Sequence, residues 1–176
     1  FNFSETFVNR QHHCLEMGRS FIVADHQKSY QGLLLLFRGI YSFIRKFPQY
    51  RVFYGTVSLS RQYQPLSVAL IQRWLCQPSD HVSARTAFDC PTIPQLEHHL
   101  AAREPRLEHL DWLIRQIEPD NKGLPILVKK YHSFGARFHC VGIDRHFADT
   151  PGLLLSVQLD QVSKKVLDFY QGTDGS

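Results

Sequence analysis

A strand–helix–strand pattern near the start of the chain limits the possible folds more than any other feature. Residues 16–23 and 51–60 are rich in apolar, β-branched and aromatic residues, which is typical of strands. Between them, over residues 33–47, apolar residues recur every three or four positions, and Pro48 ends this helical pattern. Two strands joined by a helix are usually parallel neighbours. The sequence therefore predicts a βαβ unit, in which Gly55 marks a bulge or a close backbone approach.

The later segments predict a mixed sheet with further helices around it. Helices are expected after Pro65 and over residues 94–102, 105–117, 125–134 and 163–170, and strands over residues 1–7, 137–144 and 152–159. Gly135 should cap one of these helices, because glycine adopts the left-handed conformation without strain. Residues 77–94 show no such pattern, so an insertion with helices is expected at about 77–122. The whole chain, residues 1–176, is predicted to be one α/β or α+β domain.

Composition and charge exclude several classes of protein. The 176 residues are 43% hydrophobic, which suits a single packed core. The formal charge of +4 favours an acidic carrier protein or an anionic membrane surface as a partner, but the cations are spread along the chain. Nucleic acid is therefore not an expected partner. The longest apolar run, residues 33–37, is far shorter than the roughly 20 residues that cross a bilayer.

Cysteine and histidine spacing gives little sign of metal or covalent chemistry. The four cysteines, at positions 14, 76, 90 and 140, form no CxxC pair, which predicts reduced thiols in a cytosolic protein. Adjacent histidines occur at 12–13 and 98–99, and neither pair has the i, i+4 spacing of a metal-binding helix. We therefore predict no metal site. The chain also has no GxSxG motif, so an acyl-enzyme is not expected.

Two sets of residues are candidates for a site. Glu16 and Arg19 are charges inside a strand-like run, so they should pair with each other, reach solvent or line a cleft. An ordinary structural ion pair is the alternative to a catalytic role. Gln27, Lys28 and Gly32 lie in a turn before the predicted helix, whose free N–H groups could hold a phosphate. A solvated connecting loop is the alternative there.

Eight motifs in order resemble those of the hemolysin-type acyltransferases, a family that includes ornithine- and glycine-lipid N-acyltransferases. The motifs are EMGRSF (16–21), QGLLLLFRGI (31–40), PQYR (48–51), FYGTVSLS (53–60), IEPDNKGLP (117–125), KYHSFGAR (130–137), GIDRHF (142–147) and DFYQG (168–172). The resemblance extends over most of the chain, from about residue 1 to residue 172. This family is similar to the N-acetyltransferase superfold and, more distantly, to acyl-homoserine-lactone synthases.

The resemblance implies a three-layer fold in which two parallel strands separate to admit a pantetheine arm, and residues 16–23 and 51–60 match these strands. It implies transfer of a fatty acyl group from acyl carrier protein or acyl-CoA to an amine of a small amino acid or lipid precursor. Glu16 would accept the proton of the amine, directly or through water, and Arg19 would orient Glu16 or an acidic acceptor. Backbone N–H groups around Gly55 and Val57 would polarise the thioester carbonyl.

The sequence also differs from the superfold. Its glycine-rich phosphate loop is reduced to Gln27 and Gly32, with Tyr30 at a glycine position, so acyl carrier protein is the preferred donor over coenzyme A. The family's upstream half is expected to precede this segment in a longer chain. No tightly bound cofactor is expected, and the location should be cytoplasmic or peripheral on the inner face of the membrane. Two alternatives are O-acylation of a lysophospholipid, and a non-catalytic module that docks acyl carrier protein or membrane.

Overall fold

The fold is built on a four-stranded mixed sheet with the strand order β2-β3-β6-β5. The computed structural model describes residues 1–9, 13–18, 20–26, 30–77, 79–91 and 106–171. The four strands are β2 (Cys14–Glu16), β3 (Val52–Ser58), β5 (Arg137–Asp144) and β6 (Thr150–Gln158). β2 and β3 are parallel and are joined through α2 (Tyr30–Lys46), whereas the other neighbours are antiparallel. The predicted βαβ unit and the mixed α/β class are therefore confirmed.

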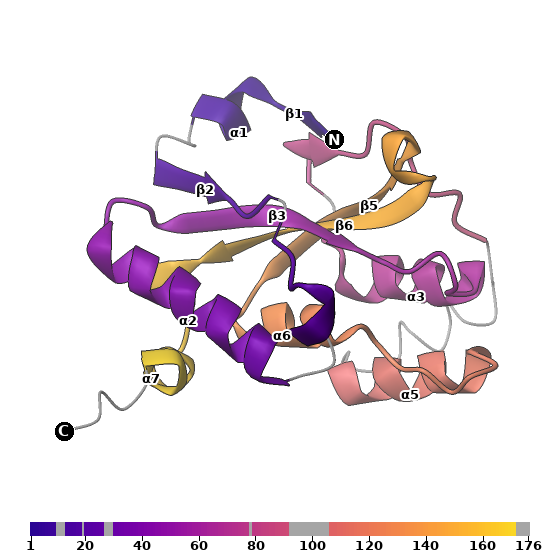
Figure 1. Ribbon diagram of the computed structural model, residues 1–176. Helices are drawn as coiled ribbons and strands as arrows, with labels where there is room; N and C mark the ends of the chain where they lie inside the picture. The colour runs from indigo at the N-terminus through magenta and orange to yellow at the C-terminus, as the bar shows by residue number, and fades with distance from the viewer. Residues whose placement is uncertain (10–12, 19, 27–29, 78, 92–105, 172–176) are drawn as a thin grey trace.

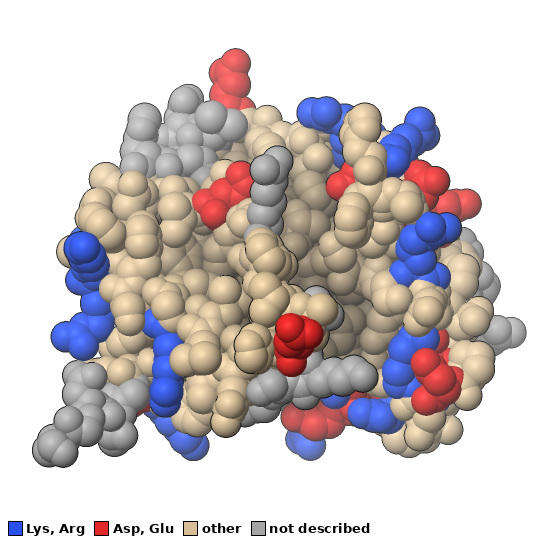
Figure 2. All heavy atoms as spheres, viewed as in Figure 1, with Lys and Arg blue, Asp and Glu red and all other residues tan. Residues whose placement is uncertain are grey.

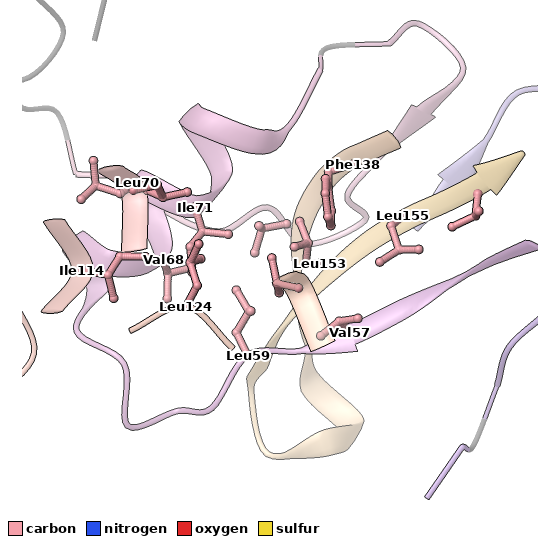
Figure 3. Packing of buried hydrophobic residues seen from close by; sticks show 14 of the residues in the cluster. Val57, Leu59, Val68, Leu70, Ile71, Ile114, Leu124, Phe138, Leu153 and Leu155 are labelled. Atoms are coloured by element: carbon pink, nitrogen blue, oxygen red, sulfur yellow. The ribbon is translucent and has the colours of Figure 1, made fainter. Parts of the chain in front are cut away.

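Five helices lie along one face of this sheet (Figure 1). They are α2, α3 (Pro65–Leu75), α5 (Leu107–Ile117), α6 (Ile126–Ser133) and α7 (Lys164–Gln171). Figure 3 shows the core between sheet and helices, where apolar side chains of both layers interdigitate. The buried cluster includes Val57, Leu59, Phe138, Leu153 and Leu155 from the sheet and its ends, and Val68, Leu70, Ile71, Ile114 and Leu124 from the helices and their connections. Burial of apolar area on this scale is the main source of stability.

The opposite face of the sheet carries fewer elements in the described part of the chain. β1 (Asn2–Phe3) and β4 (Val82–Ser83) form a two-stranded antiparallel sheet there, and α1 (Glu5–Asn9) follows β1 (Figure 1). The strand predicted over residues 1–7 is therefore wrong after Phe3. Three short 3-10 turns, η2 (Ala24–His26), η3 (Arg145–Phe147) and η4 (Leu159–Gln161), complete the described elements.

Most of the other predicted elements are confirmed, with ends shifted by a few residues. The strand predicted over 137–144 matches β5, and Gly135 after α6 has a φ of +73°. The helix predicted over 94–102 lies outside the described residues. The strand predicted over 16–23 is wrong beyond Glu16, because the described residues after it belong to no strand. Phe21 is 78% exposed, as expected where no neighbouring strand covers the chain.

The described residues offer neither a membrane span nor a metal cluster. No helix in the described ranges is both long and apolar enough to cross a bilayer. A search of the same residues found no group of three or more His, Cys, Asp or Glu side chains that could hold a metal ion. All four cysteines are free thiols.

Candidate functional site

The two parallel strands separate halfway along β3. Pairing runs from Cys14 to Glu16 on β2 and from Val52 to Tyr54 on β3, and the Met17 N–H donates to the Tyr54 carbonyl over 2.8 Å. β3 then continues to Ser58, whereas the described residues that follow Met17 belong to no strand. The second half of β3 therefore has one edge without a neighbouring strand in the described chain. We call this gap beside β3 the opening.

Gly55 lies where the strands separate. A methyl group on its Cα would be 3.2 Å from the Met17 carbonyl oxygen and 3.4 Å from the Met17 Cβ. This distance is tighter than an ordinary van der Waals contact, so a larger residue would press on the end of β2. The close backbone approach predicted at Gly55 is confirmed.

Strand alternation determines which backbone groups face the opening. The Tyr54 carbonyl points toward β2, because it accepts the Met17 N–H. Polar backbone groups of alternate residues in a strand point the same way. The N–H and C=O groups of Thr56 and Ser58 therefore point into the opening, and a bound molecule could pair with them as a strand would.

The N–H groups of Gly55 and Val57 point the other way. The hydrogen bond from the Leu59 N–H to the Pro151 carbonyl, 2.8 Å long, shows that this alternate set of β3 residues pairs with β6. Gly55 and Val57 therefore shape the opening without presenting N–H donors to it. Within the predicted segment 55–57, Thr56 supplies the donor.

Glu16 lies beside Tyr54 on the face of the sheet that the five helices leave uncovered. The two residues are register partners, so their side chains share a face, while Phe53 points toward the helices. Glu16 is exposed. Burial is the largest cause that raises the pKa of Tyr54, and the negative charges of Glu16 and Cys14 raise it further. Tyr54 is thus a neutral phenol next to the Glu16 carboxylate.

A row of polar side chains continues across the sheet from Glu16. Ser156 of β6 is the register partner of Tyr54, and its Oγ lies 2.9 Å from Nε2 of His139 on β5. His139 is 8% exposed, and its Nδ1 has no hydrogen-bond partner in the described structure. Burial, and then the charge of Arg137, lowers the pKa of His139. The imidazole is therefore held neutral at pH 7.

On the helical side of the sheet, Tyr131 of α6 lies under the opening. Its hydroxyl is 3.9 Å from the Met17 sulfur. Tyr131 lines a small cavity with Met17, Gly55, Thr56, Val57 and Leu155, which surround the point of separation. Burial raises the pKa of Tyr131, so its phenol stays protonated at neutral pH. Sequence reasoning missed this residue, although its segment, KYHSFGAR, contributes to the resemblance.

A carboxylate on α5 fixes the position of α6. Asp111 Oδ1 accepts hydrogen bonds from the Lys129 ammonium and from the Leu124 N–H, each 2.7 Å long, and Oδ2 accepts from Arg115 over 3.1 Å. Partial burial alone would raise the pKa of Asp111. The hydrogen bonds from Lys129, the Leu124 backbone and Arg115 outweigh that effect, and the pKa is lowered.

A groove of about 880 Å³ lies on the uncovered face. Thr56 and Ser58 of β3 form one side of it, so the groove adjoins the opening. Gly142 and Gly152 are register partners that line it, and the side chains of Phe1, Ala84 and Thr56 lie close to these two glycines. Figure 2 shows a hollow in the molecular surface near the middle of the view, where β3 in Figure 1 runs past the end of β2.

The structure brings some of the predicted site residues together. Glu16, Gly55 and Val57 all lie at the opening. Gly32 is in the first turn of α2 instead, where an added methyl group would be 3.0 Å from the His26 carbonyl oxygen. In the structure, Gly32 therefore allows η2 and α2 to pack closely together. Arg19, Gln27 and Lys28 lie outside the described residues.

Comparisons with protein-family models, with curated proteins and with solved structures found no match. The chemistry must therefore be inferred from the motifs and the geometry. The opening combines backbone donors, an exposed carboxylate on one face of the sheet and a partly buried phenol on the other. Such an arrangement can bind an extended chain along β3, polarise a carbonyl, accept a proton and donate one.

Proposed function

We propose that the protein is an acyltransferase, which moves a fatty acyl group from the thioester of acyl carrier protein, or of coenzyme A, to an amine of a small amino acid or lipid precursor. The observation that carries the proposal is the opening between β2 and β3. It lies between the residues that match the family motifs EMGRSF and FYGTVSLS. An extended pantetheine arm has amide groups that can pair with a free strand edge.

The thioester would lie along the free edge of β3. The N–H groups of Thr56 and Ser58 would donate hydrogen bonds to the pantetheine amides and to the thioester carbonyl. Fixed N–H donors stabilise the negative charge that develops on a carbonyl oxygen during acyl transfer. The proposal takes this sheet as half of a three-layer, N-acetyltransferase-like fold, whose upstream half would cover the polar face.

Glu16 and Tyr131 would serve the two proton transfers. The neutral amine attacks the thioester carbon, and the Glu16 carboxylate accepts the proton that the nitrogen loses, directly or through water. The tetrahedral intermediate then breaks its carbon–sulfur bond. The Tyr131 phenol donates a proton to the departing thiolate and recovers one from solvent. Arg19 would orient Glu16 or an acidic acceptor.

An apolar cavity beside the opening supports a fatty acyl donor. It lies between the sheet and α2, α6 and α7, and it shares Met17 and Tyr131 with the smaller cavity at the opening. Its volume is about 50 Å³. A long chain would therefore need side chains such as Phe37 to move, and the cavity would limit the chain lengths that are accepted.

The proposal implies a cytoplasmic protein, since acyl carrier protein is a cytoplasmic donor. A lipid-precursor acceptor would bring it to the inner face of the membrane, where its formal charge of +4 favours anionic lipid.

The test is an acyl-transfer assay with acyl carrier protein that bears an isotope-labelled acyl group. The full natural protein and this chain are each mixed with amine and hydroxyl acceptors, and the products are identified by mass spectrometry. An N-acylated product supports the proposal, whereas an O-acylated product indicates the lysophospholipid alternative. If the carrier binds but the thioester stays intact, the protein is a docking module and the proposal fails.

Variants assign the chemistry to residues. Glu16→Gln should lower turnover by about 10²-fold or more with the fold intact, which is the usual scale for a general base. Tyr131→Phe should lower it by roughly 10²-fold, because the thiolate then leaves without a proton donor. Glu108→Gln, at an exposed position on α5, is the matched control and should leave turnover unchanged. Unchanged turnover in Glu16→Gln removes Glu16 from the mechanism.

A further inference from the structure

The outward face of α2 carries positive charge and no acidic residue. Exposed residues recur on it every three or four positions, at Gln31, Leu35, Arg38, Ser42 and Arg45, with Gly39 and Lys46 beside them. We call these residues the cationic stripe. None of the 17 residues of α2 is an Asp or a Glu, and no carboxylate in the described ranges forms an ion pair with Arg38, Arg45 or Lys46. In Figure 2, Lys and Arg atoms lie along the left flank, where α2 runs in Figure 1.

Helix stability explains two of these cations but not the third. Arg45 and Lys46 lie in the last turn of α2, where positive charge interacts favourably with the helix dipole. Arg38 lies about two turns earlier, beyond the reach of this effect. The positions three and four residues away from it, which are 34, 35, 41 and 42, hold no acid that could pair with it. Arg38 therefore has no ionic partner in the described structure, which leaves a role at the surface.

Helix α7 extends the positive charge beside α2. The Tyr170 ring lies 5.6 Å from the Phe37 ring of α2, so the two helices are in contact. α7 begins with Lys164 and Lys165, both exposed, and contains one acid, Asp168. The two helices thus carry five cations, three from α2 and two from α7, against one carboxylate. Charge complementarity favours an anionic partner for this side of the protein.

The form of the stripe suits a bilayer better than a protein. A stable protein interface buries about 800 Å² on each partner and has bulky anchors near its centre. The centre of the stripe is formed by Gly39 and Ser42, which offer no anchor. An anionic bilayer attracts each Lys or Arg near its surface without a complementary pocket. Leu35, which is 63% exposed, could also enter the boundary between headgroups and acyl chains.

We propose that the cationic stripe of α2 binds the surface of a bilayer that contains anionic lipid. This inference goes beyond the proposed acyl transfer and stands without it. The opposite face of α2 lines the apolar cavity through Phe37, Ile40 and Ile44. α2 would therefore lie between the bilayer and this cavity, which suits a protein that handles a fatty chain.

The test measures binding of the full natural protein to sedimented vesicles. One set of vesicles consists of phosphatidylcholine, and the other of phosphatidylcholine and phosphatidylglycerol in equal amounts. Each cation near an anionic surface strengthens binding about fivefold, so the three cations of the stripe should give a preference of at least about 10²-fold for the anionic vesicles. The preference should vanish at about 1 M salt, where the screening length is ~3 Å. Equal binding to both sets, or none to either, would overturn the proposal.

Two triple variants locate the binding surface. Arg38→Gln/Arg45→Gln/Lys46→Gln should weaken binding to the anionic vesicles by about 10²-fold. The matched control removes the same charge from exposed arginines outside α2 and α7, namely Arg61, Arg85 and Arg106, and should weaken binding less than about fivefold. Circular dichroism should show that both variants are folded. An equal loss in the two variants would mean that binding follows net charge, and it would refute the role of the stripe.

Two further measurements separate the proposal from its alternatives. If the stripe docks a protein instead, the α2 variant weakens binding of acyl-free acyl carrier protein and leaves vesicle binding unchanged, and the proposal fails. With a soluble amine as acceptor and no lipid present, the α2 variant should keep wild-type turnover, because no side chain of the stripe lines the cavities at the opening. Reduced turnover there would count against the proposal. Vesicle binding without any acyl transfer would refute the proposed function but not the stripe.

Discussion

Removal of the Asp111 carboxylate should loosen α6 and destabilise the whole protein. In Asp111→Ala, the Leu124 N–H loses its acceptor in a place where Leu124 is 4% exposed, and an unsatisfied buried donor costs about 1–3 kcal/mol. The half-exposed contacts with Lys129 and Arg115 contribute roughly 0.3–1 kcal/mol each. The expected loss of unfolding free energy is therefore about 3 kcal/mol. Asp111→Asn keeps an oxygen for the Leu124 N–H, so it should cost only about 1 kcal/mol.

Urea denaturation followed by tryptophan fluorescence measures both variants. With a urea slope of about 2 kcal/mol per molar, Asp111→Ala should lower the midpoint by about 1.5 M. Asp120→Ala is the matched control, since this exposed carboxylate also pairs with a lysine but covers no buried donor, and it should change the midpoint far less. Equal effects of Asp111→Ala and Asp111→Asn would refute the role given to the Leu124 hydrogen bond.

The same carboxylate predicts a pH dependence. Its pKa in the folded protein is lowered, whereas the carboxyl group in the unfolded chain has the ordinary pKa of ~3.9. The stabilisation from its charge is therefore fully present above pH ~4 and is lost as the pH falls through the folded pKa. The difference in stability between wild type and Asp111→Asn should shrink in acid. A difference that stays constant down to pH ~2 would contradict this account.

Three further predictions concern the core, a thiol and a turn. Phe37→Ala removes a ring packed against three other aromatic rings, at centroid distances of 5.1–5.8 Å, and should cost about 3–5 kcal/mol in urea denaturation, far more than Phe169→Ala at an exposed position. Cys76, whose pKa burial raises to about 12, should react with iodoacetamide at pH 8 more slowly than Cys90, as peptide mass spectrometry can show. Gly135→Ala at a φ of +73° should lower the unfolding free energy by about 1–2 kcal/mol.

Periodicity predicted the parts of the fold that depend on local pattern. The apolar stripe of α2, the matching bounds of β5 and the cap at Gly135 all follow from side-chain spacing and from the freedom of glycine. The end of β2 could not be predicted in this way. Residues after Glu16 have the composition of a strand, but a strand also needs a neighbour to pair with, and pairing is a property of the folded chain.

The candidate site was also predictable only where a residue stands out in its local sequence. Glu16 stood out because a charge inside a strand-like segment requires an explanation, and Gly55 because glycine permits close backbone approach. Tyr131 carried no such signal, since an aromatic residue in a helix is usually core. Only the packing of α6 against Met17 brings its hydroxyl to the opening. The sequence likewise could not show that the N–H group of Thr56, and not that of Val57, faces the opening. That follows from the pairing of β3 with β6.

The most direct test of the central claim is to locate the acyl donor on the protein. Acyl carrier protein is loaded with a fatty acyl chain that carries a photoreactive diazirine, mixed with the full natural protein and irradiated. Peptide mass spectrometry then identifies the crosslinked residues. The account predicts crosslinks at Met17, Phe37 and Tyr131, around the opening between β2 and β3, and their loss in competition with unlabelled acyl carrier protein. Crosslinks confined to other surfaces, or none above background, would contradict it.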